Sequence, residues 1–276
     1  MEVPERGRRI RTILLELERI YNHVGDIGAI ATDVGFVIAN AHASRLRELI
    51  LGLNEELTGS RLLRGVVCPG GVRWDCGEDQ MRKALDVLTA FEREFHDLVR
   101  MLDASDSTRD RLERTGVLDP AKARDLGIVG VAGRASGIDR DVRRDHPYAA
   151  YDTIQLQPPV YQEGDVLRRL QVRVDEVGQS LAVIREVGSG MKPGPHLVRL
   201  PPLAPDRCAL SAVEGWRGEI LHWIRTGPGN HLERVKIKDP SLNNWPALVE
   251  AVQGNIVPDF PVINKSFNLS YSGTDR

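Results

Sequence analysis

The segment from Arg11 to Asn40 combines the pattern of a buried helix with ionisable side chains set among its hydrophobic residues. Its aliphatic residues recur every three or four positions, which predicts a helix with one buried face. At about 100° per residue, four of the ionisable side chains lie within roughly one third of the helix circumference, beside that face. They are Glu16, His23, Asp26 and Asp33. Because ionisable groups are seldom buried without a partner, two explanations stay open: pairing with arginines of neighbouring elements, or a functional site.

Asp33 and His23 are the two candidates for proton chemistry on this helix. Removal from water raises the pKa of a carboxyl group unless a cation pairs with it, and a carboxyl group with a raised pKa can transfer a proton. The alternative for Asp33 is an ion pair with Arg45 or Arg47. His23 is either a hydrogen-bonded core histidine or a redox-linked proton carrier. Glu16 and Asp26 are expected to be structural.

Composition places the chain among ordinary globular proteins, with 41% hydrophobic and 28% charged residues in 276. A net charge of -2 gives no general attraction to nucleic acid or anionic lipid, so no nucleic-acid partner is expected. Cys68, Cys76 and Cys208 contain no Cys-x-x-Cys and are odd in number, which favours a reducing compartment. No secretory signal is expected, and the most apolar window, Ile20–Ala39, is interrupted by charged residues.

The remaining pattern predicts a mainly α protein of the α or α+β class, a helical bundle with a small antiparallel β element. A helix beginning near Glu5 is expected to run past 30 residues, and its glycines mark either close helix contacts or breaks. Further helices are expected at 80–104, 164–187 and 239–252. GEILHWIRT and HLERVKIK are expected to form a β-hairpin, and the last segment, from 257 on, to be extended. One domain spans 1–276, with a helical core in 1–205 and the hairpin, short helix and extended segment in 206–276.

Two glycine-rich segments separate these elements. Residues 58–79 are expected to form a structured loop. Residues 127–151 contain GxxGxxGR, which lacks the lysine and the strand–helix frame of a phosphate-binding loop, so a nucleotide site is not expected there.

Five stretches, in chain order, carry a family resemblance. They read ILLELERIYNHVGDIGAIATDVG, TGSRLLRGVVCPGGV, RASGIDRDVRRDHPYAAYDT, RGEILHWI with VKIKDPSLNNWPAL, and VPDFPVINKSFNLSYSGTDR. Together they resemble the large-subunit family shared by respiratory complex I (its 49-kDa subunit) and membrane-bound nickel–iron hydrogenases of the formate hydrogenlyase and hydrogenase-4 type. The resemblance covers nearly the whole chain and implies the helical-bundle fold of the hydrogenase large subunit.

In the hydrogenases of this family, two Cys-x-x-Cys pairs hold the nickel–iron centre, and the second pair lies just before Thr-Asp-Arg. The corresponding positions here are Ser270 and Gly273. Soft thiolate ligands are absent at both, so the resemblance implies no nickel and no metal held by this chain. Cys68 and Cys76 lie in a different motif and are not substitutes.

In complex I the corresponding cavity serves quinone, beside an iron–sulfur cluster of a small partner subunit. By resemblance Asp33 falls on the acidic position linked to quinone reduction, and His23 on the histidine of the same motif. The loop 58–72 is then expected to face the partner's cluster. Its candidate residues there are Arg61, Arg64, Cys68, Gly70 and Gly71. The arginines would raise the cluster potential, and the glycines are expected to permit close backbone approach.

The loop departs from complex I, where a histidine often stands at Leu63 or Arg64 and arginine usually stands at Cys68. A polar scaffold beneath the site is expected from Arg134, Asp139, Arg143 and Tyr148. The part of the family domain that precedes Met1 is expected to be missing, and the ending at Asp275 and Arg276 to be native.

The resemblance implies an electron-transfer large subunit of an NADH:quinone oxidoreductase-type membrane complex. Such a subunit is peripheral, on the cytoplasmic side of the inner (plasma) membrane. Its expected partners are the small iron–sulfur subunit, other peripheral-arm and membrane subunits, and quinone at the subunit interface. This chain itself is expected to bind no cofactor and to be inactive when isolated. The alternatives are a large subunit of a nickel–iron hydrogenase and a non-catalytic scaffold subunit.

Overall fold

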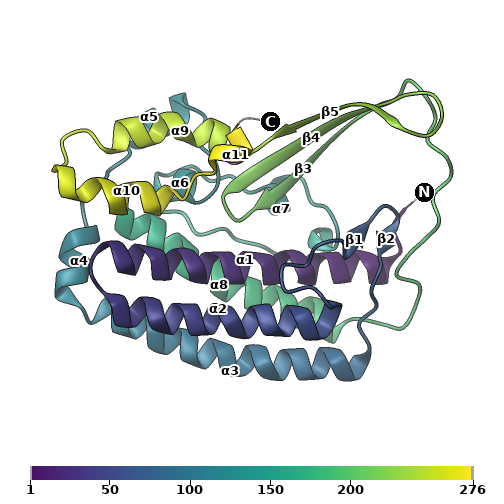
Figure 1. Cartoon of the computed structure of the whole chain (residues 1–276), viewed down its shortest axis with the longest axis horizontal. Coiled ribbons are helices and arrows are strands. Elements are labelled where there is room, and N and C mark those ends of the chain that lie inside the picture. The colour runs from purple at the N-terminus through teal and green to yellow at the C-terminus, as the bar shows by residue number, and fades with distance from the viewer. Residues whose placement is uncertain (1, 275–276) are drawn as a thin grey trace.

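Four long helices lie side by side and form the body of the molecule (Figure 1). The computed structural model describes residues 2–274, so Asp275 and Arg276 of the C-terminal motif lie outside the described residues. The long helices are α1 (Glu5–Asp33), α2 (Val37–Thr58), α3 (Glu78–Asp103) and α8 (Val166–Ser189). Helix α1 packs against both α2 and α8, so it is the central helix of the bundle. The predicted mainly α bundle is confirmed.

The expected long N-terminal helix is two helices. Gly35 has a φ of +81°, a conformation that favours glycine, and it lies in the turn between α1 and α2. Gly28 has a different role, because a Cβ atom there would lie 2.8 Å from the Cβ of Ala43 on α2. Both explanations of the glycines therefore hold: one marks a break and another permits close helix packing.

The main core lies along α1. Ile20, Val24 and Ile27 are completely buried among the apolar faces of α2, α3 and α8. Burying each such side chain stabilises the fold by about 1.5–3 kcal/mol. The apolar residues that recur every three or four positions in the sequence therefore form the buried face of α1.

Short elements lie between the long helices along the chain. They are β1 (Val67–Cys68) and β2 (Gly71–Val72), then α4 (Asp106–Leu112), α5 (Pro120–Asp125), α6 (Gly130–Ala135), α7 (Val142–Asp145) and η1 (Tyr151–Thr153). The hairpin of β1 and β2 lies within the expected loop.

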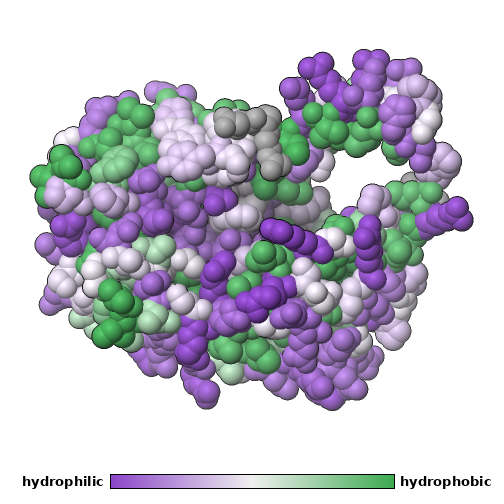
Figure 2. All heavy atoms as spheres, in the orientation of Figure 1, coloured by the Kyte–Doolittle hydropathy of each residue, from purple (hydrophilic) through white to green (hydrophobic). Residues whose placement is uncertain are grey.

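The sheet has three antiparallel strands instead of the predicted two. Strands β3 (Cys208–Gly215), β4 (Gly218–Thr226) and β5 (Leu232–Lys238) follow the order β3-β4-β5. The hairpin of β4 and β5 is confirmed, with a register shift between Arg225 and Thr226. Strand β3 was missed because its first four residues are exposed, so it lacks the alternating burial that marks a strand. In Figure 2 the far end of the sheet stands away from the helices.

The C-terminal segment is helical, and the expectation of an extended segment is wrong. After α9 (Pro240–Ala251) come η2 (Val257–Asp259), α10 (Phe260–Phe267) and α11 (Tyr271–Thr274). Pro258 and Pro261 each lie in the first turn of a helix, where the missing N–H has no helical partner to lose. Prolines that suggested extended chain are thus helix starts. No helix among residues 2–274 is long and apolar enough to span a membrane.

Candidate functional site

Glu16 lies in the first half of α1 and is completely buried. Its carboxylate accepts hydrogen bonds from Arg143 Nη1 at 3.1 Å and from Arg19 Nε at 3.2 Å. The hydroxyl groups of Ser180 and Tyr151 also donate to it. Burial alone would raise the pKa of Glu16, but these charges and donors together hold it below its ordinary value. Glu16 is therefore a buried structural anion, as the ion-pair explanation predicts.

His23 is completely buried two turns further along α1. Its Nε2 lies 2.7 Å from Glu176 Oε2 on α8. Burial lowers the pKa of His23, and because a carboxylate only accepts hydrogen bonds, Nε2 carries the hydrogen of this contact. In the neutral ring, Nε2–H is therefore the donor. Nδ1 is then a bare acceptor, and it has no hydrogen-bond partner among residues 2–274. His23 has the surroundings of a core histidine with one free proton-accepting atom.

Arg134 on α6 links Glu176 to a second group of carboxylates. Its Nε donates to Glu176 Oε1 at 2.9 Å, and its Nη1 donates to Glu214 Oε1 at 2.9 Å. Arg143 pairs with Asp141 through Nη2 at 2.7 Å. Burial alone would raise the pKa of Glu176, but the charge of Arg134 in particular holds it well below its ordinary value. The pKa of Glu214 is raised, by burial and by the charge of Asp141.

Asp26, the other carboxylate in the middle of α1, pairs with Arg173 of α8. Arg173 Nε donates to Asp26 Oδ2 at 3.1 Å, and Asn268 Nδ2 donates to Asp26 Oδ1 at 2.6 Å. The structural interpretation of Asp26 is confirmed. The hydrogen bond from Asn268 also ties α1 to the segment that precedes Ser270.

The predicted polar scaffold is largely present. Arg134 and Arg143 are both completely buried within the ion pairs just described. Tyr148 adjoins them, since its hydroxyl accepts a hydrogen bond from the backbone of β3 at 3.0 Å. Asp139 is the exception: it lies on the surface, where it pairs with Arg144. The local run of charges could not distinguish this exposed aspartate from its buried neighbours.

Asp33 ends α1, half-buried, and its Oδ2 is buried without a hydrogen-bond partner among the described residues. Burial raises the pKa of Asp33, and the charge of Lys265 opposes that rise. The alternative ion pairs are wrong: Arg45 pairs with a glutamate of α3, and Arg47 lies over an aromatic ring of α1. Ten residues of helix separate Asp33 from His23, about 15 Å, so the two candidates do not form one site.

The arginines and the cysteine of the loop follow the end of α2 along the chain. Arg61 pairs with two glutamates of α2. Arg64 is exposed and has no ion-pair partner among residues 2–274. Cys68 is a half-buried free thiol on β1. Arg64 is therefore the loop arginine whose charge is not already neutralised by this chain.

Gly70 and Gly71 permit a close backbone contact, as predicted. A Cβ atom at Gly70, whose φ is +88°, would lie 2.2 Å from the carbonyl oxygen of Val198. One at Gly71 would lie 2.1 Å from the carbonyl oxygen of His196. The two glycines therefore dock the β1–β2 hairpin onto the segment that leads to the sheet.

Ser270 directly precedes α11, and Gly273 lies within it; these are the positions where the resemblance places nickel ligands. Ser270 Oγ accepts a hydrogen bond from the Gly273 N–H at 3.0 Å. A Cβ atom at Gly273 would lie 2.6–3.0 Å from the carboxylate of Asp239. No group of three or more His, Cys, Asp and Glu side chains among residues 2–274 could hold a metal ion. The residues present do not fit a nickel centre.

Sequence reasoning missed an apolar groove of about 340 Å³ between α1, the loop after α2 and β3. Leu14, Leu63 and Val213 line it, and Arg11 and Glu18 add charge. Its lining residues are far apart along the chain, so no local pattern marks the groove. It lies beside the N-terminal half of α1, away from Asp33.

Comparison with known proteins identifies the relatives of this chain. The sequence profile described as "Respiratory-chain NADH dehydrogenase, 49 Kd subunit" matches residues 33–207 and 200–276. Formate hydrogenlyase subunit 5 of Escherichia coli is 36% identical over 276 residues, which are 100% of this chain and 48% of that protein. NADH-quinone oxidoreductase subunit 4 of Thermus thermophilus is 32% identical over 304 residues, a match that covers 99% of this chain and 74% of that protein. The chain thus spans about half the length of the first relative.

A solved structure also matches over the whole chain. It belongs to the membrane-bound sulfane sulfur reductase (MBS), an archaeal respiratory membrane complex. The TM-score is 0.93 at 32% sequence identity, and the match covers 100% of this chain and 76% of that one. Fold and sequence therefore point to the same group of proteins.

Proposed function

The chain belongs to the family of the 49-kDa subunit of respiratory-chain NADH dehydrogenase, and on that basis we propose that it is the electron-transfer large subunit of a complex I-like membrane complex. In this proposal it forms the quinone side of a cavity beside an iron–sulfur cluster carried by a small partner subunit. It lies peripherally, on the cytoplasmic side of the membrane. The isolated chain reduces nothing, because the electron donor is in the partner.

One observation carries the choice of quinone reduction over hydrogenase activity. Ser270 and Gly273 supply no thiolate, and Asp239 occupies the space that a side chain at Gly273 would need. Nickel prefers soft ligands that these positions lack. The proposal therefore keeps the fold of the family without its nickel site.

Asp33 is the proposed proton donor. Reduction of a quinone to a quinol takes two electrons, here from the partner's cluster, and two protons. A half-buried carboxyl group with a raised pKa and one unpartnered oxygen can hold a proton and release it to a quinone oxygen. Arg64 is proposed to face the cluster, where its charge favours the reduced form.

Nickel analysis tests this proposal most directly. The complex, expressed with its maturation machinery and measured by inductively coupled plasma mass spectrometry, should contain no stoichiometric nickel. One nickel per complex would reject the proposal in favour of the hydrogenase alternative.

The proton-transfer role is tested in the purified complex. Asp33→Asn should slow quinone reduction at least tenfold while subunit composition stays unchanged. Asp125→Asn, a surface aspartate at the end of α5, is the matched control and should leave turnover unchanged. Normal turnover in Asp33→Asn would remove this residue from the mechanism. Absence of quinone turnover in the wild-type complex, with an intact cluster signal in electron paramagnetic resonance, would favour the scaffold alternative.

A second acceptor is suggested by the structural neighbour, which is a sulfane sulfur reductase. The match covers 100% of this chain and 76% of that one. Turnover with a polysulfide but not with a quinone would replace quinone by sulfane sulfur in the proposal.

A further inference from the structure

The interior of the molecule holds a connected set of charges that we call the buried ion network. Its seven side chains are each no more than 2% exposed. Successive ion pairs join all of them. They are the carboxylates Glu16, Asp141, Glu176 and Glu214, and the guanidinium groups Arg19, Arg134 and Arg143.

The buried ion network is one positive charge short. Four carboxylates face three guanidinium groups, and His23 at its edge adds a positive charge only if it binds a second proton. The nearby Asp26 and Arg173 pair with each other and do not change this balance. An uncompensated charge in a protein interior is expensive, and a buried acid usually removes it by binding a proton. The network is therefore expected to hold one proton in addition to those of its arginines.

Glu214 is the carboxylate least compensated by cations. Glu16 and Glu176 each contact two arginines, and Asp141 contacts Arg143 through two nitrogens. Glu214 accepts from one arginine, at 2.9 Å, and from the backbone N–H of residue 142 at 3.1 Å. Its raised pKa agrees with this geometry.

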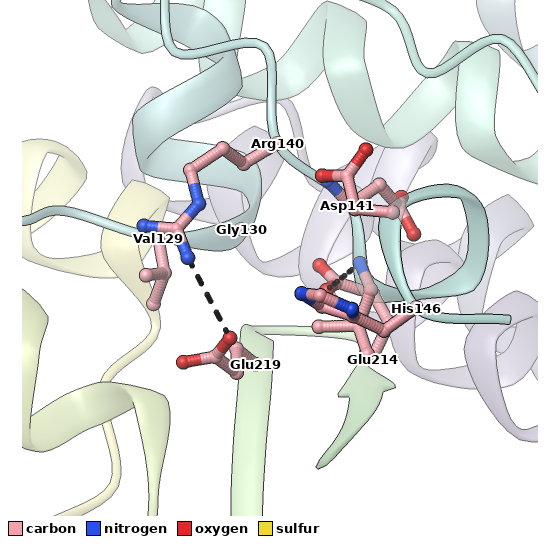
Figure 3. Close-up of a pocket in the computed structure, with 9 residues that line it drawn as sticks. Val129, Gly130, Arg140, Asp141, His146, Glu214 and Glu219 are labelled. Carbon is pink, nitrogen blue, oxygen red and sulfur yellow. Dashed lines mark hydrogen bonds and ion pairs between the residues drawn. The ribbon is translucent and has the colours of Figure 1, made fainter.

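Two carboxylates of the network, Glu214 and Asp141, line a pocket. The pocket has a volume of about 60 Å³, enough for water, and both carboxylates line it. Figure 3 shows Arg140 and Glu219 paired on one side of the pocket and His146 on the other. Arg140 and His146 are exposed, so the pocket opens to solvent.

We propose that Glu214 is a proton-binding site, loaded from water in this pocket, whose proton neutralises the buried ion network. A hydronium ion in the pocket transfers its proton to a Glu214 oxygen, forms the O–H bond and becomes water. The charged and titratable groups around Glu214 come from five parts of the chain. They are Arg134 on α6, Arg140, Asp141, Arg143, Asp145 and His146 on the segment that contains α7, Tyr148 before η1, Glu219 on β4 and Arg19 on α1. This inference rests on the charges of the described residues and not on quinone as the substrate.

The competing location for the proton is His23, whose Nδ1 is free among the described residues. Both groups contact the same Arg134–Glu176 pair, so a proton on either one makes the network neutral. A proton on His23 would produce a doubly protonated imidazolium ring. A proton on Glu214 would produce a carboxylic acid. Spectroscopy distinguishes the two.

Infrared spectroscopy of the purified full chain is the decisive experiment. At neutral pH we expect one carboxylic-acid C=O band that shifts on ¹³C-glutamate labelling and disappears reversibly as the pH is raised. Glu214→Gln should remove the band, whereas Glu219→Gln, the other glutamate of the pocket, should keep it. Histidine ¹⁵N resonances, with His23 assigned through His23→Gln, should show a neutral ring.

Three results would overturn the proposal. They are a band that persists in Glu214→Gln, a wild-type chain without a glutamate acid band, and a doubly protonated His23 at neutral pH. If Glu214→Gln does not fold, the labelling shift in the wild type still assigns the band to a glutamate, and the Glu219→Gln spectrum excludes the other glutamate of the pocket. A wild-type band that is insensitive to pH until the chain unfolds would refute loading from the pocket.

Discussion

Removing Arg134 should be among the most destabilising single changes in this chain. The Arg134→Met substitution keeps an unbranched side chain of similar length but removes the charge that Glu176 and Glu214 share. All three side chains are buried, and Glu176 does not line the pocket that admits water, so water does not replace the partner that Glu176 loses. Removing one partner of a buried ion pair costs about 3–5 kcal/mol, because a buried charge is left uncompensated. We expect a loss of free energy of unfolding in this range.

The pH dependence of this loss has a definite sign. Without Arg134, the pKa values of Glu176 and Glu214 rise above those of the unfolded chain. A group with a raised folded-state pKa contributes stability at low pH that is lost as pH rises through the folded pKa. The deficit of Arg134→Met should therefore be largest at neutral and alkaline pH and smaller in acid.

Urea unfolding followed by circular dichroism measures both effects. Arg61→Met is the control, since this exposed arginine pairs with glutamates on the surface of α2 and its loss should leave the midpoint unchanged. Because Glu214 is proposed to carry a proton already, Glu214→Gln should change the free energy of unfolding little at neutral pH, both alone and when added to Arg134→Met. A deficit below about 1 kcal/mol for Arg134→Met would refute the reasoning that the buried charges depend on this arginine.

Two further predictions concern the carboxylates and the glycines. Glu16 and Glu176 have folded-state pKa values below the ordinary 4.5, so the stability they contribute is complete above pH 4.5 and should be lost as the pH falls further. An acid titration followed by circular dichroism measures this loss. Unchanged stability between pH 4.5 and 3 would contradict the prediction. Gly70→Ala should lower the free energy of unfolding by more than about 1 kcal/mol, because the position has a positive φ and the new Cβ meets a carbonyl oxygen. Gly52→Ala, at an open position within α2, should raise it by about 0.5–1 kcal/mol in the same urea assay. Equal effects at the two glycines would disprove the proposed backbone contact.

The helical elements could be predicted from the sequence because their burial follows a local period. The apolar spacing of α1, α3 and α8 shows which face is buried, and the structure confirms all three helices. The ion-pair explanation of Glu16 and Asp26 could likewise be stated in advance, since burying a carboxylate requires a cation. Which arginine supplies it could not be known, because Arg143 and Arg173 reach α1 from segments more than 100 residues away.

The remaining differences have the same physical origin. The exposed first half of β3 pairs with β4 through backbone atoms, which carry no sequence signal. Whether Pro258 and Pro261 begin helices or interrupt them depends on how the chain packs after α9. Glu214 was not recognised as a candidate because its importance comes from a charge count over five elements, α1, α6, α7 with its N-cap, α8 and β3.

The contact between Gly273 and Asp239 makes a thiolate hard to introduce at position 273 by a single substitution. Asp239 is the N-cap of α9, and its Oδ1 accepts the N–H of Ser241 at 2.8 Å. The hydroxyl of Ser241 in turn accepts the N–H of Ser270 at 2.9 Å. A cysteine placed at position 273 would displace this carboxylate and remove a helix cap, at a cost of about 0.5–2 kcal/mol. A thiolate at position 273 and the present cap would compete for one space, so a metal ligand here would require simultaneous changes at positions 239 and 273.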